Sequence, residues 1–133
     1  MRSQKATLTV QLRKVAEFRR ATGWFGAEPD EDAPVPPTFP VALEHEGPPI
    51  VDLLIGMGYA AERLLHGEEV IDYPNGPLRV GDDLRGETHF VGSVTKRGSA
   101  GDLELLTTST ELYRPGGELA VRITRTFVAL PEG

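Results

Sequence analysis

The segment from Ile50 to Leu65 is mostly apolar and is the clearest structural signal in the sequence. Apolar residues there cover nearly the whole circumference of a helix, which is typical of a buried one. Asp52 lies near its start, where a negative charge suits the helix dipole, and Glu62 and Arg63 lie near its end. The pattern therefore predicts one continuous, mostly buried helix about 24 Å long.

Segments rich in β-branched and alternating residues predict a sheet around this helix. Residues 7–12 favour a short strand, and residues 12–23 favour a short amphipathic helix. Beyond the buried helix, glycine-rich turns separate segments that read as long strands: residues 66–73, 85–96, 103–113 and 118–130. Such turns favour an antiparallel meander. A curved antiparallel sheet around one long buried helix is the hot-dog fold, of the α+β class.

The last of these strands also suggests an assembly. Residues 118–130 contain no proline and few charges. An exposed sheet edge of that composition is normally paired in native proteins. We therefore expect no stable monomer, and a dimer or tetramer instead.

Proline marks a different kind of segment before the buried helix. Seven of the eleven prolines fall within residues 29–49. Because proline fixes φ and removes a backbone donor, we expect neither helix nor central strand there. The 28 residues before this stretch cannot form a domain alone. We interpret it as a crossover on the surface of a single domain that spans residues 1–133.

Composition excludes several classes of function. The chain has no cysteine, and its three histidines, His45, His66 and His89, lack the spacing of metal ligands, so no metal site is predicted. A net charge of −6 argues against nucleic-acid binding. No apolar run reaches the roughly 20 residues that span a bilayer, and no secretory leader is visible. We expect a cytoplasmic protein with no membrane contact.

Four local strings resemble the N-terminal-type domain of MaoC-like dehydratases, and they occur in the order of that family. They are Val-Ala-Glu-Phe-Arg-Arg-Ala-Thr-Gly at 15–23, Val-Pro-Pro-Thr-Phe-Pro at 35–40, Leu-His-Gly-Glu-Glu at 65–69 and Pro-Leu-Arg-Val-Gly-Asp-Asp-Leu at 77–84. The resemblance implies (R)-specific hydration or dehydration of 2-enoyl thioesters carried on CoA or acyl carrier protein. It places the chain among the lyases of lipid or steroid side-chain metabolism, with no other cofactor.

The sequence departs from the catalytic members of that family at one decisive place. Those members resemble one another in an Asp-x-Asn-Pro-x-His loop after the first helix, whose Asp and His hold the reacting water. After Gly23 this chain reads Trp-Phe-Gly-Ala-Glu-Pro-Asp, and it has no histidine before His45. We therefore assign no catalytic residue. The family pattern implies a partner hot-dog subunit that carries the motif, while this chain shapes the acyl-binding channel for a fatty, mycolic-type or steroid group.

The resemblance also implies which residues would contact substrate: Thr38, Phe39, Gly56, Tyr59 and His66. Other interpretations remain open for most of them. His66 could instead interact with the last carbonyls of the buried helix. Thr38 and Phe39 could simply pack the crossover, and Gly56 could allow close helix packing. His89 is expected on the sheet surface.

Two further functions compete with the heteromeric hydratase. Thioesterases of the hot-dog fold use an Asp or Glu near the buried helix, and Asp52 or Glu44 could take that role. A non-catalytic acyl-binding or scaffolding domain is the third possibility.

Overall fold

The computed structural model describes residues 3–23, 30, 35–44 and 47–131. Its strands form one antiparallel five-stranded sheet in the order β1-β3-β4-β5-β2. The strands are β1 (Ser3–Thr9), β2 (Leu64–Asp72), β3 (Asp83–Gly98), β4 (Gly101–Tyr113) and β5 (Leu119–Ala129). All five predicted strands are present, with ends displaced by a few residues. The α+β hot-dog fold is confirmed.

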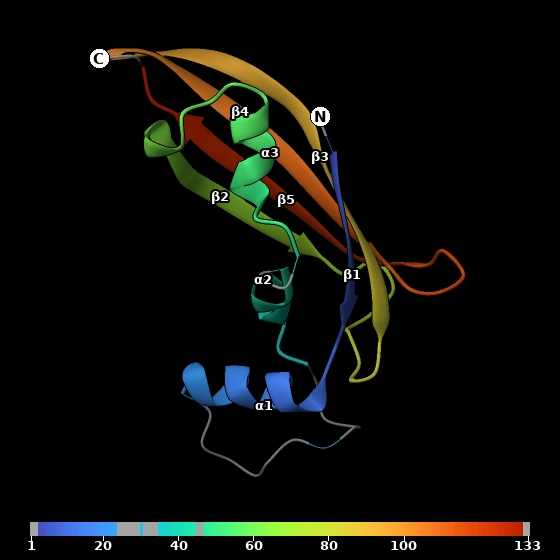
Figure 1. Ribbon diagram of the computed structural model, residues 1–133. Helices are drawn as coiled ribbons and strands as arrows, with labels where there is room; N and C mark the ends of the chain where they lie inside the picture. The colour runs from blue at the N-terminus through green and yellow to red at the C-terminus, as the bar shows by residue number, and fades with distance from the viewer. Residues whose placement is uncertain (1–2, 24–29, 31–34, 45–46, 132–133) are drawn as a thin grey trace.

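Three short helices accompany the sheet, and Figure 1 shows the first of them lying crosswise near the lower end of β1. They are α1 (Leu12–Ala21), α2 (Phe39–Glu44) and α3 (Ile50–Gly56). A single 3-10 turn, Ala61–Arg63, precedes β2. The helix α1 ends with Arg19 and Arg20 in its last turn, where positive charge complements the helix dipole.

The prediction of one continuous helix from Ile50 to Leu65 is wrong. The helix α3 ends at Gly56, because Gly58 adopts a φ of +105°, which L side chains rarely do. The Gly58 N–H donates to the Ile55 carbonyl and the Tyr59 N–H donates to the Leu54 carbonyl, which is the Schellman arrangement of a helix C-terminus. The remaining apolar residues of the run belong to a turn and to the start of β2.

The expectation that this helix is mostly buried is also wrong for the chain by itself. Leu53 and Leu54 are buried, whereas Asp52 and Gly56 are exposed and Ile55 is 43% exposed. A helix resting on one face of a sheet buries only the side that faces it.

The proline-rich crossover contains a helix that its composition did not predict. Pro40 is the second residue of α2, a first-turn position at which no intrahelical backbone donor is needed. Phe39 and Leu43 of α2 are each 1% exposed, so core packing supports this short helix. Residues 24–29, 31–34 and 45–46, which include most of the segment after Gly23 and also His45, lie outside the described residues.

The strand order differs from a simple meander. Strands β3, β4 and β5 follow one another, but β2 pairs with the far side of β5. The last strand is therefore internal, and the prediction of an open edge at residues 118–130 is wrong. Among the described residues, open edges occur along β1, along β2 and along the second half of β3, because β1 pairs only with residues 83–89 of β3.

Two groups of core residues lie on the helix side of the sheet. One joins α1 and α2 to the sheet through Val15, Phe39 and Leu43, which pack with Leu112 and Ile123. In the other, Leu54 of α3 packs against sheet residues, namely Leu106, Phe127 and Ala129. The inward positions between these two groups are polar, and they define the site.

Candidate functional site

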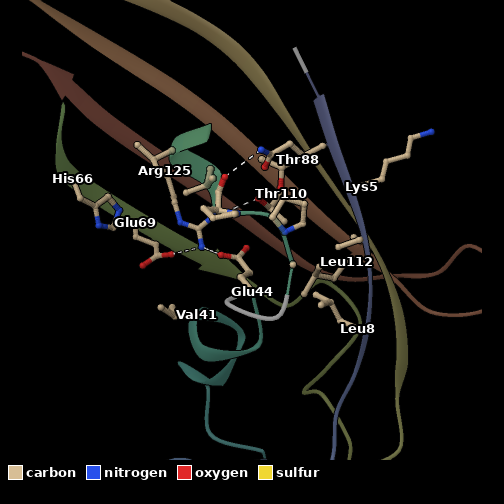
Figure 2. A pocket seen from close by; sticks show the side chains of 18 of the residues that line it. Lys5, Leu8, Val41, Glu44, His66, Glu69, Thr88, Thr110, Leu112 and Arg125 are labelled. Atoms are coloured by element: carbon tan, nitrogen blue, oxygen red, sulfur yellow. Dashed lines mark hydrogen bonds and ion pairs between the residues drawn. The ribbon is translucent and has the colours of Figure 1, made fainter. Parts of the chain in front are cut away.

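A cavity of about 380 Å³ lies between the inward face of the sheet and the segment that carries α2 and the start of α3 (Figure 2). Val41 and the Pro48-Pro49 pair line its crossover side. Leu8 and Phe127 contribute to its sheet side, so the cavity touches both core groups. It is largely apolar, apart from a belt of polar side chains across its middle.

Arg125 is the centre of that belt. On β5 it stands between Ile123 of one core group and Phe127 of the other, at an inward position that is 4% exposed. Glu69 is its register partner on β2, and Glu69 Oε1 lies 2.8 Å from Arg125 Nη2. Glu44, the last residue of α2, accepts a hydrogen bond from the same nitrogen. One buried guanidinium thus joins the sheet to the crossover.

Burial lowers the pKa of Arg125 without removing its charge at neutral pH. Desolvation lowers the pKa of its guanidinium to about 10, which still leaves the group protonated at neutral pH. A buried charge persists only where opposite charge and hydrogen bonds compensate it. Glu44 and Glu69 provide the opposite charge, and Thr110 Oγ1 accepts a longer hydrogen bond of 3.4 Å from Arg125 Nη1.

Two threonines extend the polar belt toward β1. Thr88 of β3 and Thr110 of β4 are register partners, and their hydroxyl oxygens lie 2.7 Å apart. Both line the cavity. Figure 2 shows Arg125, Glu44 and Glu69 converging on one side of these threonines, while Lys5 points away from the cavity. The belt therefore holds one cation, two carboxylates and two hydroxyls.

Of the five residues predicted to contact substrate, His66 alone lines this cavity. It lies in β2 rather than at a helix end, and its ring centroid is 5.3 Å from that of Phe127. Phe39 is buried in the core against Phe18, with ring centroids 5.5 Å apart. Thr38 and Gly56 are exposed. Substrate contact by these four residues stays a prediction.

Tyr59, the fifth of these residues, lines a second, separate cavity of about 480 Å³. Its hydroxyl donates to Glu104 Oε2 at 2.8 Å. Burial and the neighbouring Glu104 carboxylate raise the pKa of Tyr59. A role for Tyr59 in substrate contact likewise stays a prediction.

The two carboxylates considered for a thioesterase, Glu44 and Asp52, differ in their position relative to the cavity. Glu44 lines the cavity, whereas Asp52 is exposed in the first turn of α3 and does not. On the outer side of the sheet, His89 lies 3.6 Å from Glu111 with its side chain 45% exposed, as the surface interpretation expected.

Arg125 and Glu69 were missed by reasoning from the sequence, although β5 carries a signal for the arginine. Val121, Ile123 and Phe127 alternate with outward residues, and Arg125 falls in phase with the apolar set. A charged residue at a core position is unusual unless it is paired. The partners come from α2 and β2, whose spatial relation to β5 the sequence does not reveal.

No group of side chains suited to a metal ion occurs among the described residues. In that same part of the chain, no helix has the length and apolar character required to cross a membrane.

Comparisons with known proteins agree on one fold. The family model described as "FAS1-like, dehydratase domain region" matches residues 1–122. No curated protein matches the chain. Among solved structures, the HadBC (3R-hydroxyacyl-ACP dehydratase) complex of Mycobacterium tuberculosis contains a chain with 16% identity and a TM-score of 0.74, over 96% of this chain and 94% of that one.

Two other structures of the same organism are also similar. The ChsH1-ChsH2 complex contains a chain with 14% identity and a TM-score of 0.71, over 98% of this chain and 85% of that one. HtdX has 22% identity and a TM-score of 0.70, over 97% of this chain and 51% of the HtdX chain. At these identities the structural similarities establish the fold.

Proposed function

We propose a function from the premise that this chain belongs to the family of FAS1-like, MaoC-like hot-dog dehydratase domains. The chain is a subunit of a heteromeric enoyl-thioester hydratase or dehydratase. It forms the acyl-binding wall, and a second hot-dog subunit supplies the catalytic Asp and His. The acyl group is carried on CoA or on acyl carrier protein.

The observation that carries this proposal is that the carboxylates in the cavity are ion-paired with an arginine. Addition of water to an enoyl thioester needs a base within hydrogen-bond reach of the water. The sequence contains no Asp-x-Asn-Pro-x-His motif. The carboxylates that line the cavity, Glu44 and Glu69, are both paired with Arg125. These two carboxylates serve as the counter-charges of a buried guanidinium, which is a different arrangement from the Asp–His pair of the motif.

An open sheet edge supports the partner. Among the described residues, residues 90–98 of β3 pair with β4 along one edge and with no strand along the other edge. Val91 and Val94 on this segment are 58% and 60% exposed. Open edges with exposed aliphatic residues are normally covered. We propose that the partner hot-dog pairs along this half of β3, and that the HadBC and ChsH1-ChsH2 complexes are the relevant precedents.

Co-purification with a candidate hot-dog subunit that carries the motif tests the proposal. The chain alone should hydrate 2-enoyl-CoA substrates at background rates, and the complex should be active. Replacing the partner's motif Asp or His should abolish activity, whereas His66→Ala in this chain should slow the complex by less than the roughly 10²–10⁴-fold typical of a lost general acid or base. Ordinary turnover by the chain alone, abolished by His66→Ala, would refute the proposal.

The cavity position of Glu44 favours one second candidate, a hot-dog thioesterase. Glu44 would then act on the thioester or on the attacking water. Hydrolysis of saturated acyl-CoA by the purified chain, lost in Glu44→Gln and kept in Asp52→Asn, would support this function over the hydratase subunit.

A further inference from the structure

The polar belt contains more hydrogen-bond acceptors than donors. An ionised carboxylate only accepts hydrogen bonds and offers about four acceptor sites. Arg125 Nη2 serves both Glu44 and Glu69. The contact with Glu69 Oε1 is an ion pair at 2.8 Å, and neither Glu69 Oε1 nor Glu44 Oε1 has a hydrogen-bond partner. Two buried carboxylate oxygens therefore accept no hydrogen bond from the described residues.

The belt also interrupts surfaces that would otherwise suit a plain hydrocarbon chain. Leu8 and Leu112 lie at one end of the cavity, and Ile50 and Phe127 belong to the other core group. Between them stands Arg125, with Glu44, Glu69, Thr88 and Thr110 around it. An alkyl chain laid across this belt would bury polar groups and give them no partner, which is unfavourable.

We propose that the acyl group taken by this cavity carries a hydroxyl remote from the thioester, which donates a hydrogen bond to the carboxylate of Glu44 or Glu69 beside Arg125. The inference rests on the proposed function and names its substrate class. A hydroxyl fits because it donates one hydrogen bond and accepts others. Its proton meets a carboxylate oxygen, and its lone pairs face the donors on Arg125 or Thr110. A ketone at the same position has only acceptor sites, so it would oppose the carboxylates.

Equilibrium binding tests the proposal without requiring turnover. The probes are octanoyl-CoA, its hydroxy derivatives with the hydroxyl at successive carbons beyond C4, and the matching oxo derivatives. All are saturated and unsubstituted at C3, so a hydratase cannot convert them. We expect at least one hydroxy isomer to bind roughly 10-fold or more tightly than octanoyl-CoA in calorimetric titration, because hydrogen bonds to charged groups are the strong ones. The oxo isomer should bind no better than octanoyl-CoA.

Matched variants connect the preference to the belt. Glu44→Gln and Glu69→Gln keep the side-chain shape and remove one charge, so each should reduce the hydroxyl preference several-fold. Glu68→Gln is the control, because Glu68 is the neighbour of Glu69 on β2 and is exposed. It should leave the preference unchanged. Measuring both Glu variants guards against one of them failing to fold.

The outcomes separate this inference from the proposed function. Titrations are run on the full chain and on its complex with the catalytic subunit. Equal binding of plain and hydroxylated chains, tighter binding of the oxo isomers, or an undiminished preference in both Glu→Gln variants would overturn the inference, even if the complex hydrates enoyl-CoA. A hydroxyl preference in a complex without hydratase activity would refute the proposed function and support the inference.

Discussion

Removing the charge of Arg125 should destabilise the fold far more than removing a surface arginine does. Arg125→Met keeps an unbranched side chain but deletes the cation that is paired with both Glu44 and Glu69. The Arg125 side chain is 5% exposed, and those of Glu44 and Glu69 are each 19% exposed. Two partly buried carboxylates would then face each other without compensation.

The magnitude follows from the burial. Breaking a buried ion pair by removing one partner costs roughly 3–5 kcal/mol, because the remaining charge stays desolvated. The carboxylates left behind are each 19% exposed, so solvent screening moves the expected cost toward the lower end of this range. A domain of this size is stable by about 5–15 kcal/mol, so the variant should remain folded but with much lower stability. At about 4 °C per kcal/mol, Tm should fall by roughly 12–20 °C.

Urea denaturation at pH 7, followed by circular dichroism, measures the effect. The control is Arg122→Met, three residues earlier on β5, whose side chain is 48% exposed and lies 3.9 Å from Glu111. It should cost at most about 1 kcal/mol. Adding Glu44→Gln and Glu69→Gln to Arg125→Met should restore much of the stability, because no buried charge remains. A cost for Arg125→Met within about 1 kcal/mol of the control, with no recovery in the triple variant, would refute the electrostatic account.

Three further changes test other parts of the structure. Leu54→Ala should lower the free energy of unfolding by roughly 2–5 kcal/mol, since Leu54 is fully buried in the second core group; a loss below this range in urea denaturation would argue against that packing. Burial raises the pKa of Tyr73 to about 12, so the folded chain keeps a proton that the unfolded chain loses near pH 10, and stability falls as pH rises through this window; Tyr73→Phe should flatten that fall, and parallel pH profiles would contradict the sign. Val94→Lys should weaken assembly along β3, whereas Val70→Lys on β2 should not, as judged by light scattering; equal effects would place the interface elsewhere.

The strands were predictable because their signals are local. Alternation and glycine-rich turns place β3, β4 and β5 within a few residues of their observed bounds. Strand order is not local, and nothing in the pattern of β2 indicates that it pairs with β5 rather than with β3. The wrong assignment of the open edge follows from that missing information.

The prediction of one long buried helix was wrong for a different reason. A long, mostly apolar segment fits a buried helix as well as it fits a helix followed by a turn and a strand. The signal that separates them was Gly58, whose position after the helix allows the left-handed conformation that ends it. Reading the two glycines as spacers for close packing assigned the residues beyond Gly58 to a helix, when they begin the edge strand that carries His66 and Glu69.

The polar belt explains why the site was harder to predict than the fold. Each core group is built from residues whose apolar character is visible one by one, so their inward phase can be read along a strand. Arg125 points inward like its apolar neighbours on β5, but it is charged. Its buried charge is compensated by Glu44 and Glu69, which are 81 and 56 residues away in sequence. A buried charge of this kind adds little stability over an apolar residue. Its retention between two otherwise apolar groups is therefore better explained by a ligand that needs polar partners there than by the requirements of folding, and the hydroxylated acyl chain is the ligand that matches its excess of acceptors.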